Sequence, residues 1–143
     1  MKMKSALTII GLTLLIASCK KDKPAEDCSV STSNLAATYK LTALKYKASA
    51  AMPEQDYMLF MDDCEKDDLI KLNSNGTYNY TDAGVECSPS GSGNGTWSVN
   101  GNSLQSDGLL TGTISSYNCR DLVYYLENTY TAGDRLTFTM TRQ

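Results

Sequence analysis

Arg135-Leu136-Thr137-Phe138-Thr139-Met140-Thr141-Arg142 alternates apolar and polar side chains more cleanly than any other stretch of this chain. Successive side chains of a β-strand point to opposite faces of the sheet. The alternation therefore predicts a half-buried strand, with Leu136, Phe138 and Met140 directed inward and the threonines directed toward water.

Short segments with a similar pattern precede this strand at even spacing. Thr38–Lys47 places Tyr39, Leu41 and Ala43 on one predicted face, and Lys40 and Thr42 on the other. The remaining strand-like segments are Asp56–Met61, Asp68–Leu72, Thr77–Thr81, Thr96–Val99, Ser103–Ser106, Leu110–Tyr117 and Asp121–Tyr130.

Turn-forming residues separate these segments, notably Asn73-Ser74-Asn75-Gly76, Asn100-Gly101-Asn102 and Thr131-Ala132-Gly133-Asp134. A chain of about eight short strands joined by tight turns removes its exposed edges by closing on itself. The predicted fold is all-β, an antiparallel up-and-down meander closing into a small β-barrel.

The start of the chain carries a different kind of signal. Lys2 and Lys4 precede an apolar run from Ala6 to Ile16, which ends on Ala17-Ser18-Cys19. This layout is typical of a secretory signal peptide. The apolar run is shorter than the roughly 20 residues of a membrane-spanning helix, which disfavours an uncleaved anchor. The small-small-Cys ending resembles the lipobox of bacterial lipoproteins, and the resemblance implies that Cys19 becomes the acylated (palmitate-bearing) first residue. The alternative is a secreted protein in which Cys19 is a free thiol.

These signals divide the chain into three parts. Residues 1–18 are predicted to be a lipoprotein signal peptide, residues 19–33 a polar, flexible tether, and residues 34–143 the β-barrel domain. We expect the protein to be held in the bacterial cell envelope by the lipid on Cys19, with the membrane as its partner. The outer membrane is the expected location, and the sequence leaves its periplasmic and surface faces as alternatives.

The cysteine count agrees with this division. The chain has 5 cysteines, and assigning Cys19 to the lipid leaves an even set for an oxidising compartment. Cys64 and Cys87 bracket a predicted hairpin, so we pair them with each other and therefore pair Cys28 with Cys119. Other pairings of the four, and metal binding by free thiols, are the alternatives.

Charge and composition exclude several functions. Without the two lysines of the signal, 11 basic residues face 16 acidic ones, which predicts no binding to nucleic acid. The chain has no histidine, which removes Ser-His-Asp and Cys-His catalysis and the commonest metal ligand. We expect no enzymatic activity, no cofactor and no metal; hydrolysis by a carboxylate pair is the surviving enzymatic alternative. The acidic residues of the segment Asp62–Asp68 lack EF-hand spacing and are predicted to be solvated surface charge.

An ordered set of motifs carries a family resemblance. Asp63-Cys64-Glu65-Lys66-Asp67-Asp68 precedes the Asn-Gly-Thr hairpin of Leu72–Tyr78, which is followed by Cys87 and Gly95-Thr96-Trp97. Over most of residues 35–143 this resembles the lipocalin-like domains of bacterial lipoproteins, which implies a calycin-type barrel whose interior takes a small apolar molecule. Lipocalins usually carry Gly-x-Trp in the first strand, where this chain has Ala37-Thr38-Tyr39, so we expect the base of the barrel to be plugged differently.

The predicted registers direct six aromatic side chains inward: Tyr39, Tyr78, Tyr80, Trp97, Tyr124 and Phe138. In a wide barrel they would line a ligand cup, whereas in a small one they would fill the core, which the short strands favour. We interpret the protein as a binding module for a small hydrophobic ligand, which requires a cavity of roughly 300 Å³ or more. The alternative is a structural or interaction lipoprotein with a filled barrel, which presents its loops to another envelope component.

Overall fold

The computed structural model describes residues 27–143. The predicted signal peptide, Cys19 and the tether up to residue 26 lie outside the described residues. Among the residues described, no helix has the length and hydropathy needed to cross a membrane.

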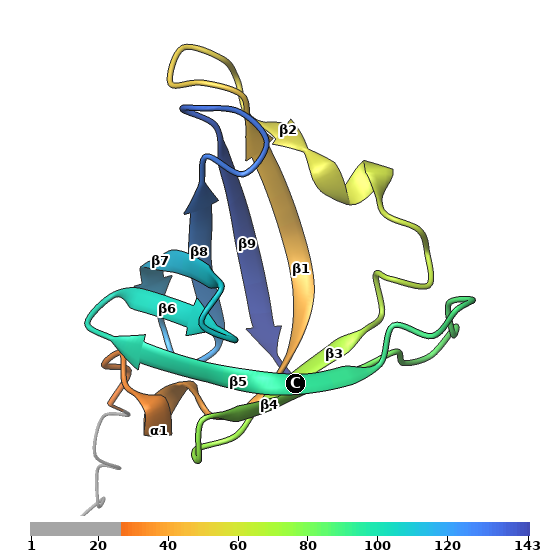
Figure 1. The fold of residues 1–143 in the computed structure, drawn as a ribbon, viewed down its shortest axis with the longest axis vertical. Helices are drawn as coiled ribbons and strands as arrows, with labels where there is room; N and C mark the ends of the chain where they lie inside the picture. Colours follow the sequence, from red (N-terminus) through yellow and green to blue (C-terminus); the bar gives the residue numbers. More distant parts are fainter. Residues whose placement is uncertain (1–26) are drawn as a thin grey trace, which may run out of the picture.

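Within residues 27–143, nine antiparallel strands form one sheet (Figure 1). Each strand pairs with its neighbours in the chain, except that β1 lies between β2 and β3. An additional pairing of β1 with β9 closes a ring of eight strands, to which every strand except β2 belongs. The strands are β1 (Thr38–Lys47), β2 (Gln55–Asp56), β3 (Leu69–Leu72), β4 (Thr77–Thr81), β5 (Gly93–Asn100), β6 (Ser103–Ser106), β7 (Leu110–Tyr117), β8 (Asp121–Glu127) and β9 (Arg135–Arg142). The predicted fold class, an all-β antiparallel meander that closes, is confirmed.

Strand β9 begins and ends where the alternation predicts. It pairs along its length with both β1 and β8, and it therefore forms the seam that closes the ring. Leu136 is buried, and Phe138 and Met140 face the interior cavity, so the predicted inward face of this strand is confirmed.

A β-bulge at Thr42 changes the predicted register of β1. Leu41 is paired with Met140 and Ala43 with Thr139, so that Thr42 is left without a partner in this ladder. An extra residue in one strand reverses the alternation beyond it. The second half of β1 therefore directs Leu44 inward in place of Ala43, and Leu44 is 9% exposed.

The segment predicted as Asp56–Met61 is not a strand of that length. Strand β2 has only two residues, and a 3-10 helix, η1 (Tyr57–Phe60), follows it directly. The Asp56 carboxylate accepts a hydrogen bond from the Met58 backbone N–H at 3.0 Å. This local side-chain bond caps the helix, which explains why an apolar run leaves the extended conformation here.

Several other strand ends and one helix also differ from the predictions. Strand β5 begins at Gly93 instead of Thr96, and β8 ends at Glu127 instead of Tyr130. Helix α1 (Thr32–Leu35) crosses the predicted boundary between tether and domain, and the Ser31 hydroxyl accepts a hydrogen bond from the Asn34 N–H as its N-cap. A helix of one turn has too few residues to show a periodic pattern.

The buried core lies at the end of the ring that α1 covers, which we call the base. It contains Leu35, Tyr39, Leu72, Trp97, Ile114 and Leu122. Helix α1 lies below the ring, whereas the turns between β1 and β2 and between β8 and β9 lie at the opposite end (Figure 1).

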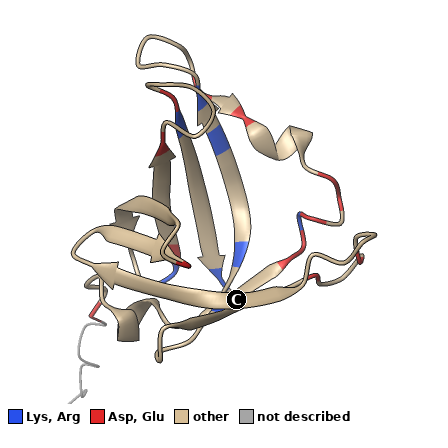
Figure 2. Cartoon of the chain, in the orientation of Figure 1, with Lys and Arg blue, Asp and Glu red and all other residues tan. Residues whose placement is uncertain are grey.

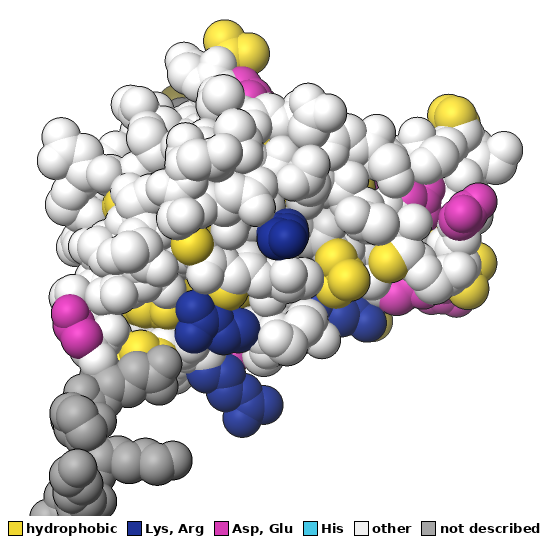
Figure 3. Space-filling view, turned by 90° about the horizontal axis from the view of Figure 1, so that it is seen from below, with side chains coloured by type: hydrophobic (Ala, Val, Ile, Leu, Met, Phe, Trp, Pro, Cys, Tyr) yellow, Lys and Arg dark blue, Asp and Glu magenta, His cyan; other side chains and the backbone are white. Residues whose placement is uncertain are grey.

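Charged residues are unevenly placed. Basic residues lie along β1 and β9, and many acidic residues lie in the connecting segments (Figure 2). The view of the base shows several Lys and Arg side chains on that face (Figure 3). Arg142 at the end of β9 is paired with Tyr39, and Lys71 of β3 with Thr38, which places both basic residues at the base.

Candidate ligand pocket

A cavity of about 230 Å³ occupies the interior of the ring above the core. Every one of the eight ring strands contributes to its wall. Its lining consists of Tyr39, Ile70, Leu72, Tyr78, Trp97, Leu104, Gln105, Ser106, Leu110, Gly112, Leu122, Tyr124, Leu126, Phe138 and Met140. We call this cavity the pocket. Within the described part of the chain, no charged residue lines it.

Two aromatic residues close the pocket toward the base. Tyr39 is 0% exposed, and its hydroxyl donates a hydrogen bond to the Leu35 carbonyl at 3.0 Å. The Trp97 indole N–H donates to the Asn73 carbonyl, also at 3.0 Å. Both polar groups have hydrogen-bond acceptors inside the protein, and the two rings form the floor of the pocket. Burial raises the pKa of Tyr39 above its ordinary value, and the nearby Tyr117 adds to this effect.

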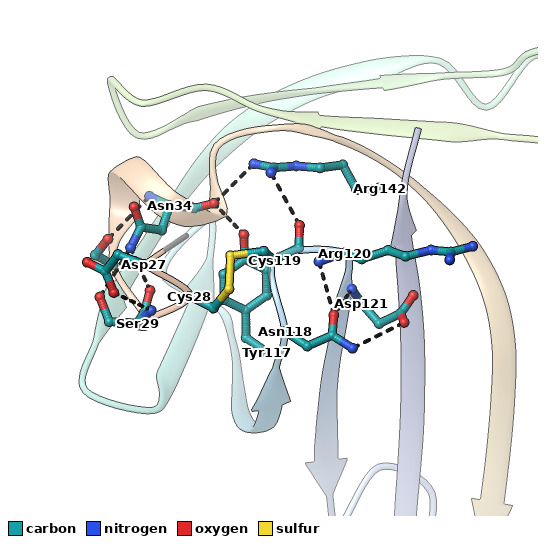
Figure 4. Close-up of a disulfide and its surroundings, with 11 residues drawn as sticks. Asp27, Cys28, Ser29, Asn34, Tyr117, Asn118, Cys119, Arg120, Asp121 and Arg142 are labelled. Atoms are coloured by element: carbon teal, nitrogen blue, oxygen red, sulfur yellow. Dashed lines mark hydrogen bonds between the residues drawn. A yellow bond between two sulfur atoms is a disulfide. The ribbon is translucent and has the colours of Figure 1, made fainter. Parts of the chain in front are cut away.

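Helix α1 is attached to the ring through Asn34, which lies beside Tyr117 and Arg142 (Figure 4). The Asn34 carbonyl accepts hydrogen bonds from the Tyr117 hydroxyl at 2.6 Å and from the Arg142 guanidinium at 3.2 Å. Arg142 also donates to the Cys119 carbonyl, and Cys119 is bonded to Cys28. The base is thus plugged by helix α1, which a disulfide and hydrogen bonds from Arg142 attach to the ring.

Glycine 95 allows one wall of the pocket to form. A Cβ atom built on Gly95 would lie 2.6 Å from the Tyr78 ring, closer than real Cβ contacts. The Tyr78 hydroxyl donates to Asp107 at 2.7 Å, and Asp107 also accepts from the Thr96 N–H at 2.7 Å. The Thr96 N–H, followed by the Tyr78 hydroxyl, lowers the pKa of Asp107. The Gly-Thr-Trp motif therefore supplies space, a hydrogen-bond donor and a floor residue in succession.

The opposite wall carries a stacked aromatic pair. The rings of Tyr124 on β8 and Phe138 on β9 lie 4.9 Å apart with an interplanar angle of 5°. These residues face each other directly across the two strands. Burial raises the pKa of Tyr124 to about 12.

The structure brings five of the six predicted aromatic residues to the pocket: Tyr39, Tyr78, Trp97, Tyr124 and Phe138. Tyr80, the sixth, is not among the residues that line the pocket. It pairs with Gly93 at the start of β5 and lines a more open depression of about 300 Å³, which shares Ile70, Tyr78 and Ser106 with the pocket. The Tyr80 hydroxyl donates to the buried Asp68 carboxylate, which holds the ring there.

Sequence reasoning predicted that Met140 points inward but missed the other aliphatic residues of the lining. Leu122 and Leu126 flank Tyr124 at two-residue spacing on β8, as Met140 flanks Phe138 on β9. That alternation was the available signal. No sequence signal pointed to Gly112, because its place in the lining depends on the position of the Tyr124 ring. A Cβ atom built on Gly112 would lie 3.1 Å from that ring.

Both predicted disulfides are present. Cys28 is bonded to Cys119, and Cys64 to Cys87 across the β3–β4 hairpin. Cys19, the predicted lipid-attachment residue, lies outside the described residues.

The acidic segment is only partly solvated surface charge. Asp62, Asp63 and Glu65 are exposed, as predicted. Asp68 is 7% exposed, because its carboxylate accepts hydrogen bonds from Tyr80 and from the Ala83 N–H. No group of three or more Cys, Asp or Glu residues in the range 27–143 is arranged to hold a metal ion.

Comparison with known proteins identifies the family. A family model described as a lipocalin-like domain matches residues 35–124. This range begins at the last residue of helix α1 and includes most of the ring. No curated protein and no solved structure gives a significant match.

Proposed function

Since the chain belongs to the lipocalin-like domain family, we propose that it is a lipid-anchored binding module of the cell envelope that holds a small hydrophobic ligand in its pocket. The observation that carries the proposal is a cavity lined by all eight ring strands and by no charged side chain among the described residues. Apolar walls with a few polar groups are typical of small-molecule sites.

The size of the pocket limits the ligand. Its volume of about 230 Å³ is below the predicted minimum of roughly 300 Å³, at which sites for drug-sized molecules begin. The predicted size of the cavity is therefore wrong, and the proposal is limited to smaller ligands. A cavity of about 150 Å³ is enough to bind benzene. The pocket therefore fits a compact ligand, larger than a single benzene ring but smaller than an extended lipid.

The location of the protein is inferred from the cysteines. The Ala17-Ser18-Cys19 ending supports acylation of Cys19, and two disulfides are typical of an oxidising compartment. Together they support attachment to the bacterial cell envelope, where we propose the outer membrane as the location. The lipocalin-like fold is typically a binding fold, and a chain without histidine lacks the commonest general base. A role in binding is therefore favoured over catalysis.

Native mass spectrometry of the chain purified from its own host tests the proposal. We expect a bound small molecule in the wild type and its loss in Leu126→Trp, because the larger side chain fills the pocket that Leu126 lines. Leu109→Trp is the matched control, since Leu109 is 86% exposed and lies outside the lining. A wild-type chain without ligand, or a ligand that both variants retain, would contradict the proposal.

A role in presenting loops to an envelope component is the second candidate. An exposed apolar cluster at the end of the ring opposite the base favours it: Phe60 is 74% exposed, Leu59 77% and Tyr130 62%. The Tyr57 ring joins them, at 5.2 Å from Phe60 and 6.5 Å from Tyr130. A photocrosslinking residue at position 60 should form adducts in cells, and the same residue at the exposed Asn102 should form none. Equal adducts from both positions would count against this role.

A further inference from the structure

The polar groups in the pocket wall differ in whether the protein itself satisfies them. The Tyr39 hydroxyl, the Trp97 indole N–H and the Tyr78 hydroxyl each donate to an acceptor of the protein, at 3.0, 3.0 and 2.7 Å respectively. These three residues shape the pocket, but their donors are already used. Besides Tyr124, the lining has two other polar residues, both on β6. The Ser106 hydroxyl donates to Asp107 at 3.5 Å, and Gln105 is exposed.

Tyr124 is different. Its hydroxyl forms no hydrogen bond with any residue of the described range 27–143, although stacking on Phe138 fixes its ring. Within that range, Asp67 Oδ1 is the only fully buried side-chain polar atom without a partner. The Tyr124 hydroxyl therefore keeps some accessible surface, and Tyr124 lies in the lining of the pocket.

An unused donor in an apolar wall restricts what can bind there. Burial raises the pKa of Tyr124 to about 12, so the hydroxyl stays protonated at neutral pH. An anionic ligand would lose its hydration without gaining a cation, because no Lys or Arg of the described chain lines the pocket. An uncharged acceptor is cheaper to bury and completes the hydrogen bond.

We propose that the pocket selects an uncharged, largely apolar ligand that carries one hydrogen-bond acceptor, such as a carbonyl oxygen, and that the Tyr124 hydroxyl donates to it. This inference rests on the proposed function, that the pocket holds a small molecule. Tyr124 is then the residue that determines specificity, and the floor and the stacked Phe138 supply apolar contact.

Three probes of similar shape separate these contributions. Acetophenone has a carbonyl acceptor, isopropylbenzene has none, and benzoate is an anion. Each is titrated into the wild-type chain, Tyr124→Phe and Tyr125→Phe, with binding followed by ligand-observed nuclear magnetic resonance. Tyr125 is the matched control, since its ring lies beneath the Arg135 guanidinium at 4.0 Å and outside the lining.

Tyr124→Phe should weaken acetophenone binding by about 2- to 10-fold, the value of one hydrogen bond. Isopropylbenzene binding should be unchanged in this variant, and benzoate should bind the wild type more weakly than acetophenone does. Tyr125→Phe should bind all probes as the wild type does. An independent measurement on the wild type is the infrared carbonyl stretch of bound acetophenone, which a donated hydrogen bond shifts to lower frequency.

The failures are distinguishable. If neither uncharged probe binds the wild type, the proposed function fails together with this inference. If both uncharged probes bind the wild type, the inference alone is tested. It fails if Tyr124→Phe weakens the binding of neither probe, or of both probes equally, or if the carbonyl stretch of bound acetophenone does not shift. The pocket would then hold ligands without a hydrogen bond from Tyr124. Benzoate binding as tightly as acetophenone would overturn the preference for an uncharged ligand.

Discussion

At the scale of single residues, Gly95 shows how the absence of a side chain positions the pocket wall. Tyr78 and Asp107 both occupy the space that a Cβ at position 95 would need. Gly93 lies two residues earlier on β5, and a Cβ built there meets nothing within 4 Å. The two glycines therefore differ in packing while they share a strand.

We expect Gly95→Ala to lower the free energy of unfolding by about 1 to 3 kcal/mol, since overpacking forces the Tyr78 ring and its bond to Asp107 to move. Gly93→Ala should change it by less than about 0.5 kcal/mol. Urea denaturation of both variants checks this difference. Equal stabilities would mean that the wall adjusts without cost.

We expect Asp134 to make the stability of the protein dependent on pH through the turn between β8 and β9. The residue is 1% exposed, and its carboxylate accepts hydrogen bonds from the N–H groups of Thr129, Tyr130 and Thr131. Burial by itself raises the pKa of Asp134, but these hydrogen bonds together outweigh it, so the pKa lies below the ordinary value of 3.8.

A carboxyl with a lowered pKa in the folded state binds fewer protons than in the unfolded state. Its contribution to stability is therefore present above about pH 4 and is lost as the pH falls through the folded-state pKa. Asp134→Asn should be less stable at pH 7 and should lose less stability on acidification than the wild type does. Thermal melting between pH 7 and pH 2 measures both effects, with Asp62→Asn at an exposed position as the control. Parallel curves for Asp134→Asn and the wild type would contradict the assignment.

At the scale of elements, the predictions succeeded where one residue pattern persists through a whole strand. Strand β9 was predicted to the residue, because its alternation continues from Arg135 to Arg142. The bulge at Thr42 was not predictable, since both Ala43 and Leu44 are apolar and only pairing with β9 decides which of them faces inward. Helix η1 was missed because a single capping bond from Asp56 overrides an apolar run.

The two disulfides should stabilise the fold unequally. Cys28 and Cys119 are 91 residues apart in the sequence, whereas Cys64 and Cys87 are 23 apart. In the chain-entropy model, the longer loop is worth about 4 to 5 kcal/mol and the shorter about 3 kcal/mol. The Cys28–Cys119 bond also holds α1 against the base, where Asn34 meets Arg142.

Replacing Cys28 and Cys119 by serine should therefore cost more stability than replacing Cys64 and Cys87 by serine. Guanidinium denaturation of the two double variants gives the comparison. The Tyr117 ring should also become more mobile in the first variant only, since its hydroxyl donates to Asn34. The reverse order of stabilities would show that α1 holds the base without its disulfide.

At the scale of the whole molecule, the candidate site was predictable in kind but not in size. The inward faces of β1, β4, β5, β8 and β9 gave five of the lining aromatic residues. Whether these rings fill the interior depends on how the strands splay. Strand β5, for example, pairs with β4 through its first half and with β6 through its second. No local pattern in the sequence encodes that arrangement.

The attachment of Cys28 at the base sets how the proposed lipid anchor would orient the domain. Nine residue steps separate Cys19 from Cys28, and these can span at most about 30 Å when fully extended. The base, with Lys71 and Arg142, should then face the bilayer. A fluorophore on an unnatural residue at Gln143, at the base end of β9, should be quenched by headgroup quenchers in vesicles more strongly than one at Ala132, in the opposite turn. Replacing Cys28 and Cys119 by serine removes the bond between the tether and the base, and should reduce the difference in quenching between the two positions. Equal quenching at both positions in the disulfide-bonded protein would show that the tether does not orient the ring.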